Sequence, residues 1–296
     1  MRSTRTKSAF LNLANLLLIL FLLFPIVAVV QGSLMSEKTV HVDIHAVIPP
    51  EVTLENFVLV LTQGKYRGEV NTSITSTYMP DNIKTFYRAF LNSLVIALSV
   101  TLLTLVLGSF SAYTIVRLRF RWTFWFLQSN LVARFVPLIS LMIPLFVVGR
   151  SLGLINSLTG VILAEAGFLL PYAILILAPY FQSLPNELED AACVDGCTRF
   201  GAFIRVILPL SAPGLTACGV IMFIVSWHEL LIPLVLNAQV DYMTLPMVLS
   251  SLVGDTNILF NVMMALALLS LIPTLVMVLL LQKYVVHGLA SGALKG

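Results

Sequence analysis

The sequence predicts an all-α membrane protein with six transmembrane helices, because of its composition and its long uncharged stretches. Of its 296 residues, 58% are hydrophobic and only 10% are charged, and the mean hydropathy is +0.97. A soluble domain contains about 25% charged residues, so the charges here are too few to cover a surface that faces water. This composition excludes a soluble enzyme, a disordered chain and a basic nucleic-acid-binding protein.

Six stretches are long enough to span a bilayer, whose hydrocarbon core of about 30 Å requires roughly 20 helical residues. Four stretches contain windows of 23 to 29 residues without a charge, and two more are interrupted only by Arg134 and by Glu165. The predicted spans are 9–31, 89–115, 123–148, 158–181, 214–236 and 260–282.

The first span follows Arg2, Arg5 and Lys7, and it also fits a secretory signal peptide. However, the apolar run Leu16–Val30 is long, and no small-x-small cleavage site closes it. We therefore expect an uncleaved membrane anchor.

Basic residues determine the predicted orientation, because cytoplasmic loops carry an excess of Lys and Arg. With the N-terminus inside, the inner segments contain ten basic residues and the outer segments six, five of them in the long loop 32–88. Basic residues in long loops carry less weight in this rule, so the count favours an N-terminus on the inner side. We expect a multi-pass membrane protein with a membrane domain over 9–283 and cytoplasmic tails at 1–8 and 284–296.

Neither a disulfide framework nor a metal site is expected. The three cysteines, Cys193, Cys197 and Cys218, all fall on the inner side or within a span. Cys193 and Cys197 are spaced by one helical turn, but no His or further Cys lies nearby in the sequence to complete a zinc site.

The inner segment 183–213 contains the most informative pattern in the chain. Acidic residues crowd the first turns of a predicted helix, where the helix dipole favours them. Gly196 interrupts this helix, and a second short helix continues to Pro209. Its apolar stripe has helical spacing and is expected to be buried: Phe200, Phe203, Ile204, Ile207 and Leu208. The charges exclude this segment from lipid, and the residues alone fit either a packed loop or a docking element for a soluble partner.

The residues ELEDAACVDGC, followed by ILPLSAP, resemble the EAA signature of bacterial ATP-binding-cassette importer permeases. The resemblance implies that this segment is the coupling helix that docks in a groove of the ATPase subunit. Asp190 stands where Glu is usual, which shortens the carboxylate arm and keeps its charge. The coupling residues expected on this basis are Glu187, Asp190, Ala191, Ala192, Asp195, Gly196, Phe200, Phe203 and Pro209.

Two further motifs resemble the carbohydrate branch of these permeases. SWHELLIPLVL is similar to their Ser-Trp-Asn-Glu pattern, with His228 in place of Asn. The C-terminal GLASGALKG looks like the tail of maltose-type permeases, which enters the interface of the paired ATPases. This resemblance implies interface roles for Gly288, Ser291, Gly292 and Lys295.

Polar groups at membrane depth form a second candidate site, because charges there are costly and often functional. The candidate substrate path consists of Trp227, His228, Glu229, Glu165 and Arg134. The alternative is that these groups satisfy kinked backbone and neighbouring helices. The sequence leaves both interpretations open.

The resemblance implies a transport subunit without a catalytic site, a metal or a cofactor of its own. Its implied partners are a second permease, two ATPases that use ATP and Mg, an external solute-binding protein, membrane lipid and a sugar. A maltose-like or trehalose-like disaccharide or glycoside is expected, with a polyol or phosphorylated polyol as the alternative. The chain contains no Gly-x4-Gly-Lys-Ser/Thr phosphate loop. A stand-alone secondary transporter is the competing hypothesis, although it predicts internal repeats that the sequence does not show clearly.

Overall fold

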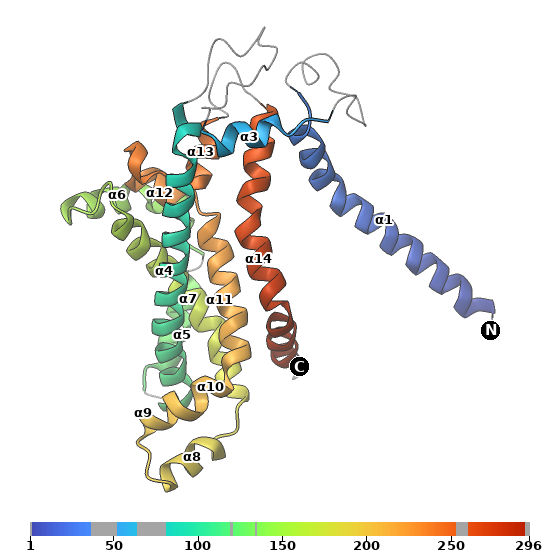
Figure 1. Ribbon diagram of the computed structural model, residues 1–296. Helices are drawn as coiled ribbons and strands as arrows, with labels where there is room; N and C mark the ends of the chain where they lie inside the picture. Colours follow the sequence, from blue (N-terminus) through green and yellow to red (C-terminus); the bar gives the residue numbers. More distant parts are fainter. Residues whose placement is uncertain are drawn as a thin grey trace. The chain divides into compact units, whose positions relative to one another are not determined.

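The computed structural model describes residues 2–36, 52–63, 81–118, 121–133, 135–252 and 260–293 (Figure 1). Every regular element in these ranges is a helix, which confirms the predicted all-α class. The chain divides into two compact units, Met1–Phe86 with Val248–Ile272 and Tyr87–Met247 with Pro273–Gly296.

The first unit contains α1 (Arg2–Ser33), α3 (Glu55–Leu61) and the beginning of α14 (Phe260–Ala293). The side chains of α1 from Leu16 to Val30 are apolar and largely exposed within the chain, which suits contact with lipid. Buried Asn56 joins the three elements. Its amide nitrogen donates to the carbonyl oxygens of Ser33 and Met35, and its amide oxygen accepts from Asn261.

The second unit begins with α4 (Phe86–Tyr113), which continues through the short π-helix η2 (Thr114–Leu118). It then contains α5 (Thr123–Ala133), the 3-10 turn η3 (Leu138–Leu141) and α6 (Met142–Ser151). The long helix α7 (Leu158–Ser183) follows, and Ser157 caps it by accepting a hydrogen bond from the Gly160 N–H at 3.0 Å.

The predicted span 123–148 differs from the structure, because α5 and the η3–α6 stretch are bent by 96°. Pro137 has an extended backbone, with ψ of 126°, directly before η3. Proline offers no N–H to a helical ladder and disfavours the helical conformation of the residue before it. The tract is therefore two helices rather than one, and Gly153 ends the second with a φ of +67°.

The predicted span 214–236 is also broken. It comprises α11 (Ala212–Trp227) and α12 (Leu231–Leu236), which are separated by His228, Glu229 and Leu230. The 3-10 turn η5 (Val240–Tyr242) and α13 (Leu245–Ser251) follow. Among the described residues, four helices are long and apolar enough to cross a membrane. The number rises to six if each of two bent pairs is one span, and these pairs are Thr123–Ala133 with Leu138–Ser151 and Arg199–Leu210 with Ala212–Trp227.

The core of the second unit lies where α11 and α12 pack against α7. Phe181, Phe203, Phe223 and Trp227 are among its largest buried side chains. At the other end of α11, Gly214 lies against the ring of Tyr180, and a Cβ there would meet ring atoms at 2.6 Å. Small residues of this kind let membrane helices approach closely.

We expect Gly214→Ala to lower the stability of the protein by about 1–3 kcal/mol, since the added methyl group would overpack this contact. The measurement is the unfolding temperature of the purified protein in detergent. Gly167→Ala in α7 is the matched control, because its Cβ would meet no atom within 4 Å. The control should be neutral or stabilising by about 0.5–1 kcal/mol, and equal unfolding temperatures for the two variants would contradict the packing argument.

Candidate functional site

The segment 183–213, here called the coupling segment, connects α7 to α11 through four short helical pieces. These are α8 (Glu187–Val194), α9 (Arg199–Ala202), the π-helical turn η4 (Phe203–Ile207) and α10 (Leu208–Leu210). The structure therefore contains the two short helices and the intervening break that the sequence predicts.

The break after α8 is a Schellman motif with Gly196 in the left-handed region. Gly196 has a φ of +90°, its N–H donates to the Cys193 carbonyl at 3.1 Å, and the Cys197 N–H donates to the Ala192 carbonyl at 3.0 Å. Thr198 then caps α9 by accepting from the Gly201 N–H at 3.1 Å. These local hydrogen bonds define the turn between the two helices.

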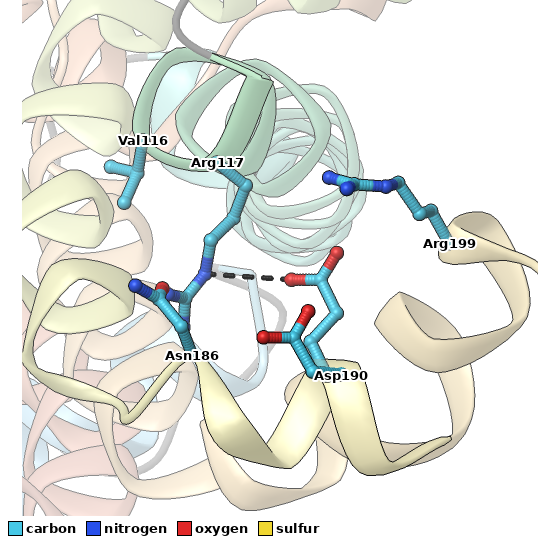
Figure 2. A pocket seen from close by; sticks show the side chains of 6 residues that line it. Val116, Arg117, Asn186, Asp190 and Arg199 are labelled. Atoms are coloured by element: carbon cyan, nitrogen blue, oxygen red, sulfur yellow. Dashed lines mark ion pairs between the residues drawn. The ribbon is translucent and has the colours of Figure 1, made fainter. Parts of the chain in front are cut away.

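The inward face of α8 presents Glu189 and Ala192, which are its buried residues. The Tyr113 hydroxyl donates to Glu189 Oε1 at 2.7 Å, and Arg117 Nε lies 3.6 Å from Glu189 Oε2 (Figure 2). The Arg117 guanidinium also donates to the carbonyl of Leu184, the C-cap residue of α7, at 3.0 Å. One arginine therefore links η2, the end of α7 and α8.

Sequence reasoning counted Glu189 only as a charge in the first turn, and it missed Tyr113 and Arg117. The carboxylate and its tyrosine partner are 76 residues apart in the chain. The usable signal was weak: Glu189 and Ala192 are three positions apart and therefore share a helix face.

Within this chain the second helix buries only part of its apolar stripe, which the sequence expects to be buried against the chain itself or against a partner. Phe203 and Ile207 are buried, and the Phe203 ring lies 4.4 Å from Tyr113 and 5.4 Å from Phe110, measured between ring centroids. Phe200 remains 59% exposed although its ring stacks on Phe110, and Ile204 is also exposed. A four-residue helix followed by a π-helical turn does not keep one continuous 3.6-residue face.

The outward face of the coupling segment combines carboxylates with apolar side chains. Val194 is 88% exposed, and Leu188 is exposed as well. Asp190 lines an open pocket of about 290 Å³ with Asn186 and Arg199 (Figure 2). Of the predicted coupling residues, Ala192 and Phe203 point into the protein, and the others are exposed: Glu187, Asp190, Ala191, Asp195, Gly196, Phe200 and Pro209.

The structure places the candidate path residues in mixed surroundings. Trp227 is buried, with its ring stacked on Phe223 at 5.8 Å. His228 is exposed, and its Nε2 lies 3.4 Å from the Thr274 hydroxyl. Arg134 lies outside the described residues.

The two acidic residues of the candidate path have partners within the chain. Glu229 Oε1 accepts from the N–H groups of Leu231 and Ile232 at 2.8 and 3.3 Å, so this side chain caps α12. Glu165 is 2% exposed and accepts a hydrogen bond from the Ser226 hydroxyl. The stacking of Trp227 on Phe223 and the capping contact of Glu229 favour the packing interpretation for these two residues. A role in substrate binding stays a prediction.

The tail residues are described only by their backbone. Gly288, Ser291 and Gly292 belong to α14, which ends at Ala293, and Lys295 lies outside the described residues. Their predicted contact with an ATPase stays a prediction.

Comparison with known proteins identifies a family. Residues 104–291 match the sequence model of the "Binding-protein-dependent transport system inner membrane component" family. The trehalose transport system permease protein SugB of Mycobacterium tuberculosis is 33% identical over 98% of this chain and 98% of its own length. The sulfoquinovosyl glycerol transport system permease protein SmoH of Agrobacterium fabrum is 36% identical over 69% of this chain and 72% of its own length.

A solved structure also shares the fold. It is the crystal structure of a bacterial ABC transporter involved in the import of the acidic polysaccharide alginate, and the matched chain has a TM-score of 0.78. The alignment covers 96% of this chain and 98% of the other, at 20% identity. This likeness supports the predicted importer-permease core as a fold.

The capping contact of Glu229 allows an experiment that distinguishes a packing role of this residue from a role in the substrate path. Glu229→Ala removes the acceptor for two N–H groups of α12, so we expect it to lower stability by about 0.5–2 kcal/mol, as the loss of a helix cap does. Glu229→Gln keeps Oε1 as an acceptor and should retain the wild-type unfolding temperature. If Glu229→Gln instead keeps its stability but loses transport, the carboxylate acts in the substrate path.

Proposed function

We propose that this chain, which belongs to the family of binding-protein-dependent transport system inner membrane components, is one of two permeases in an ATP-driven sugar importer. It forms the translocation path with a second permease subunit. Two cytoplasmic ATPases dock on the coupling segments, and an external solute-binding protein delivers the sugar. The chain itself is not an enzyme in this proposal, and ATP and Mg are used by the partner subunits.

The outward face of the coupling segment is the observation that carries this proposal. Its carboxylates make it unsuited to lipid, while Val194 and Phe200 are apolar side chains that remain exposed to water. Asp190, four positions before Val194 in the sequence, is also exposed and has no ion pair with any residue that the structure describes. A soluble protein with an apolar groove and a basic rim would cover both kinds of group, and an ATPase subunit is the partner that the family implies.

The proposed substrate is a glycoside or disaccharide. Trehalose and sulfoquinovosyl glycerol, which appear in the names of the two relatives, are both glycosides. A phosphorylated polyol is less well supported, because the sequence shows no cluster of basic residues in its spans that would bind phosphate.

The proposed topology places both termini and the coupling segment in the cytoplasm. ATP-driven closure of the ATPases would then move α8 and tilt the helices joined to it, which opens the path to one side at a time. This mechanism requires α8 to move as a rigid body with the membrane helices.

Copurification tests the assembly. The affinity-tagged chain is extracted from native membranes in mild detergent, and the proteins bound to it are identified by mass spectrometry. We expect a second permease of the same family and an ATPase with a phosphate loop. A chain that transports sugar in liposomes without either partner would support the stand-alone secondary transporter instead.

Uptake measurements test the substrate class. Cells that express the complete importer are given labelled trehalose, with unlabelled glycosides, polyols and polyol phosphates as competitors. Competition by glycosides supports the proposal. If only a polyol or a polyol phosphate competes, the result would contradict a glycoside substrate and favour a polyol instead.

Gly196→Val should uncouple transport while the protein remains in the membrane, since a β-branched residue at a φ of +90° distorts the turn between α8 and α9. We expect sugar uptake to fall about tenfold or more, a size typical of coupling between sites. Gly153→Val is the matched control: its φ is +67°, and neither glycine would place a Cβ within 4 Å of another atom. Normal uptake by the Gly196 variant would contradict the proposed coupling role.

We also propose that the C-terminal tail enters the ATPase interface, as the resemblance to maltose-type permeases implies. Deletion of residues 291–296 should change the stimulation of ATP hydrolysis by the loaded binding protein without loss of the assembled complex. The comparison is with a chain that lacks only Gly296. Unchanged stimulation in the longer deletion would count against this role.

A further inference from the structure

Two neighbouring carboxylates of α8 differ in exposure and in their partners. Both line the pocket with Arg117 and Arg199, but Glu189 is 5% exposed and contacts Tyr113 and Arg117, whereas Asp190 is exposed (Figure 2). Adjacent residues on a helix point in directions about 100° apart, so one helix turn can present one acid inward and the next outward. Asp190, the outward acid, belongs to the proposed docking surface. Glu189, the inward acid, is not part of that surface.

The inward carboxylate uses both of its oxygens on one neighbouring helix. Glu189 Oε1 accepts from the Tyr113 hydroxyl at 2.7 Å, and Oε2 pairs with Arg117 Nε at 3.6 Å. Tyr113 and Arg117 lie four positions apart, so they are neighbours on one side of the helix. The side chains of Arg117 and Glu189 are each 6% exposed, which protects the pair from screening by salt.

Apolar packing alone does little to hold α8 in place. Within this eight-residue helix, Ala192 is the other buried residue, and its side chain is a single methyl group. Val194 and Leu188 face outward. The contacts of Glu189 therefore give α8 a direct polar link to Tyr113 at the end of α4 and to Arg117 in η2.

We infer that Glu189, held by Tyr113 and Arg117, is the positioning residue that makes α8 move together with α4 and the end of α7 when an ATPase closes. This inference rests on the proposed function. The Tyr113 hydroxyl gives Glu189 a directional hydrogen bond, and the buried ion pair with Arg117 adds charge attraction at 3.6 Å, so the two contacts together resist sliding and rotation more than a methyl contact does. Arg117 extends the link to α7 through the Leu184 carbonyl at 3.0 Å.

A purely structural role for this cluster makes a different prediction. Buried ion pairs add little net stability compared with apolar replacements of the same size. If the cluster only stabilised the fold, its loss would reduce the amount of assembled complex, and each remaining complex would transport normally. If it transmits movement, each assembled complex would hydrolyse ATP but transport less sugar per ATP.

Glu189→Gln is the first variant, because it removes the charge and keeps the size of the side chain. The assembled complex is purified through a tagged ATPase and reconstituted in liposomes, and labelled trehalose is the first probe. The amount of permease per ATPase, the rate of ATP hydrolysis and the sugar transported per ATP are measured. We expect normal assembly and a fall of about fivefold or more in sugar per ATP.

Asp190→Asn is the matched control, one residue away on the outward face. It removes the same charge from the proposed docking surface, so it should lower the amount of permease that copurifies with the tagged ATPase rather than the sugar transported per ATP by the complexes that form. The same effect from both variants would overturn the distinction between the inward and the outward acid.

Two further variants keep the test decisive if Glu189→Gln does not fold. Tyr113→Phe removes one hydroxyl and leaves the ion pair, and it should lower sugar per ATP by a smaller factor. The double variant Arg117→Met with Glu189→Met leaves no unpaired buried charge, so it should assemble but remain uncoupled. Wild-type sugar per ATP in both variants would overturn the inference.

Failure of the inference can be told from failure of the proposed function. If the wild-type chain binds no ATPase, the proposed function fails and the inference fails with it. If the wild-type complex assembles and transports while the Glu189 variants transport as much sugar per ATP, only the inference fails.

Discussion

The lipid environment imposes the constraint on which the rest of this structure depends: a polar group at membrane depth must find its partner within the protein. In the second unit, side chains meet this requirement at several helix ends. Glu229 caps α12 where the fifth predicted span breaks, and Ser157 caps α7. Arg117 donates to the carbonyl of Leu184 at the opposite end of α7. Bent and interrupted helices are therefore possible here without unpaired backbone at these ends.

The same constraint explains why the polar residues of the spans have two possible roles. Glu165 accepts from Ser226, and this contact joins α7 to α11. Its second oxygen, Oε1, has no hydrogen-bond partner among the residues that the structure describes. A buried carboxyl group with one unused acceptor can serve packing in one conformation and meet a sugar hydroxyl in another. Trp227, by contrast, is enclosed by aromatic rings.

The coupling segment divides its residues between two tasks. Its inward residues, Glu189 and Phe203, fasten it to α4, and its outward residues, Asp190 and Val194, remain free for a partner. A docking element needs both, because a surface that binds an ATPase transmits force only if it is firmly attached to the membrane helices. The EAA signature marks the position of this element in the sequence, but it does not separate the two groups of residues.

The sequence predicted the helical class, the membrane location and the position of the coupling segment, since these follow from composition, hydropathy and a local motif. It placed one span over 123–148, although Pro137 indicated a kink there; proline alone does not predict a break, because Pro171 and Pro273 lie inside helices that continue. It also did not show which residues of the apolar stripe this chain buries itself: Phe200 and Ile204 remain exposed, because a π-helical turn shifts the helical face.

The sequence by itself determined which stretches prefer lipid and where the chain must leave it, because hydrophobicity and charge are local properties of the residues. Only the tertiary structure decided that Glu189 meets Tyr113 and Arg117 and that Glu229 caps a helix rather than standing free. A side chain's partner depends on which distant segment folds beside it. The small number of charges marked this chain as a membrane protein. Only the packing showed which of those charges are paired within the chain and which remain exposed.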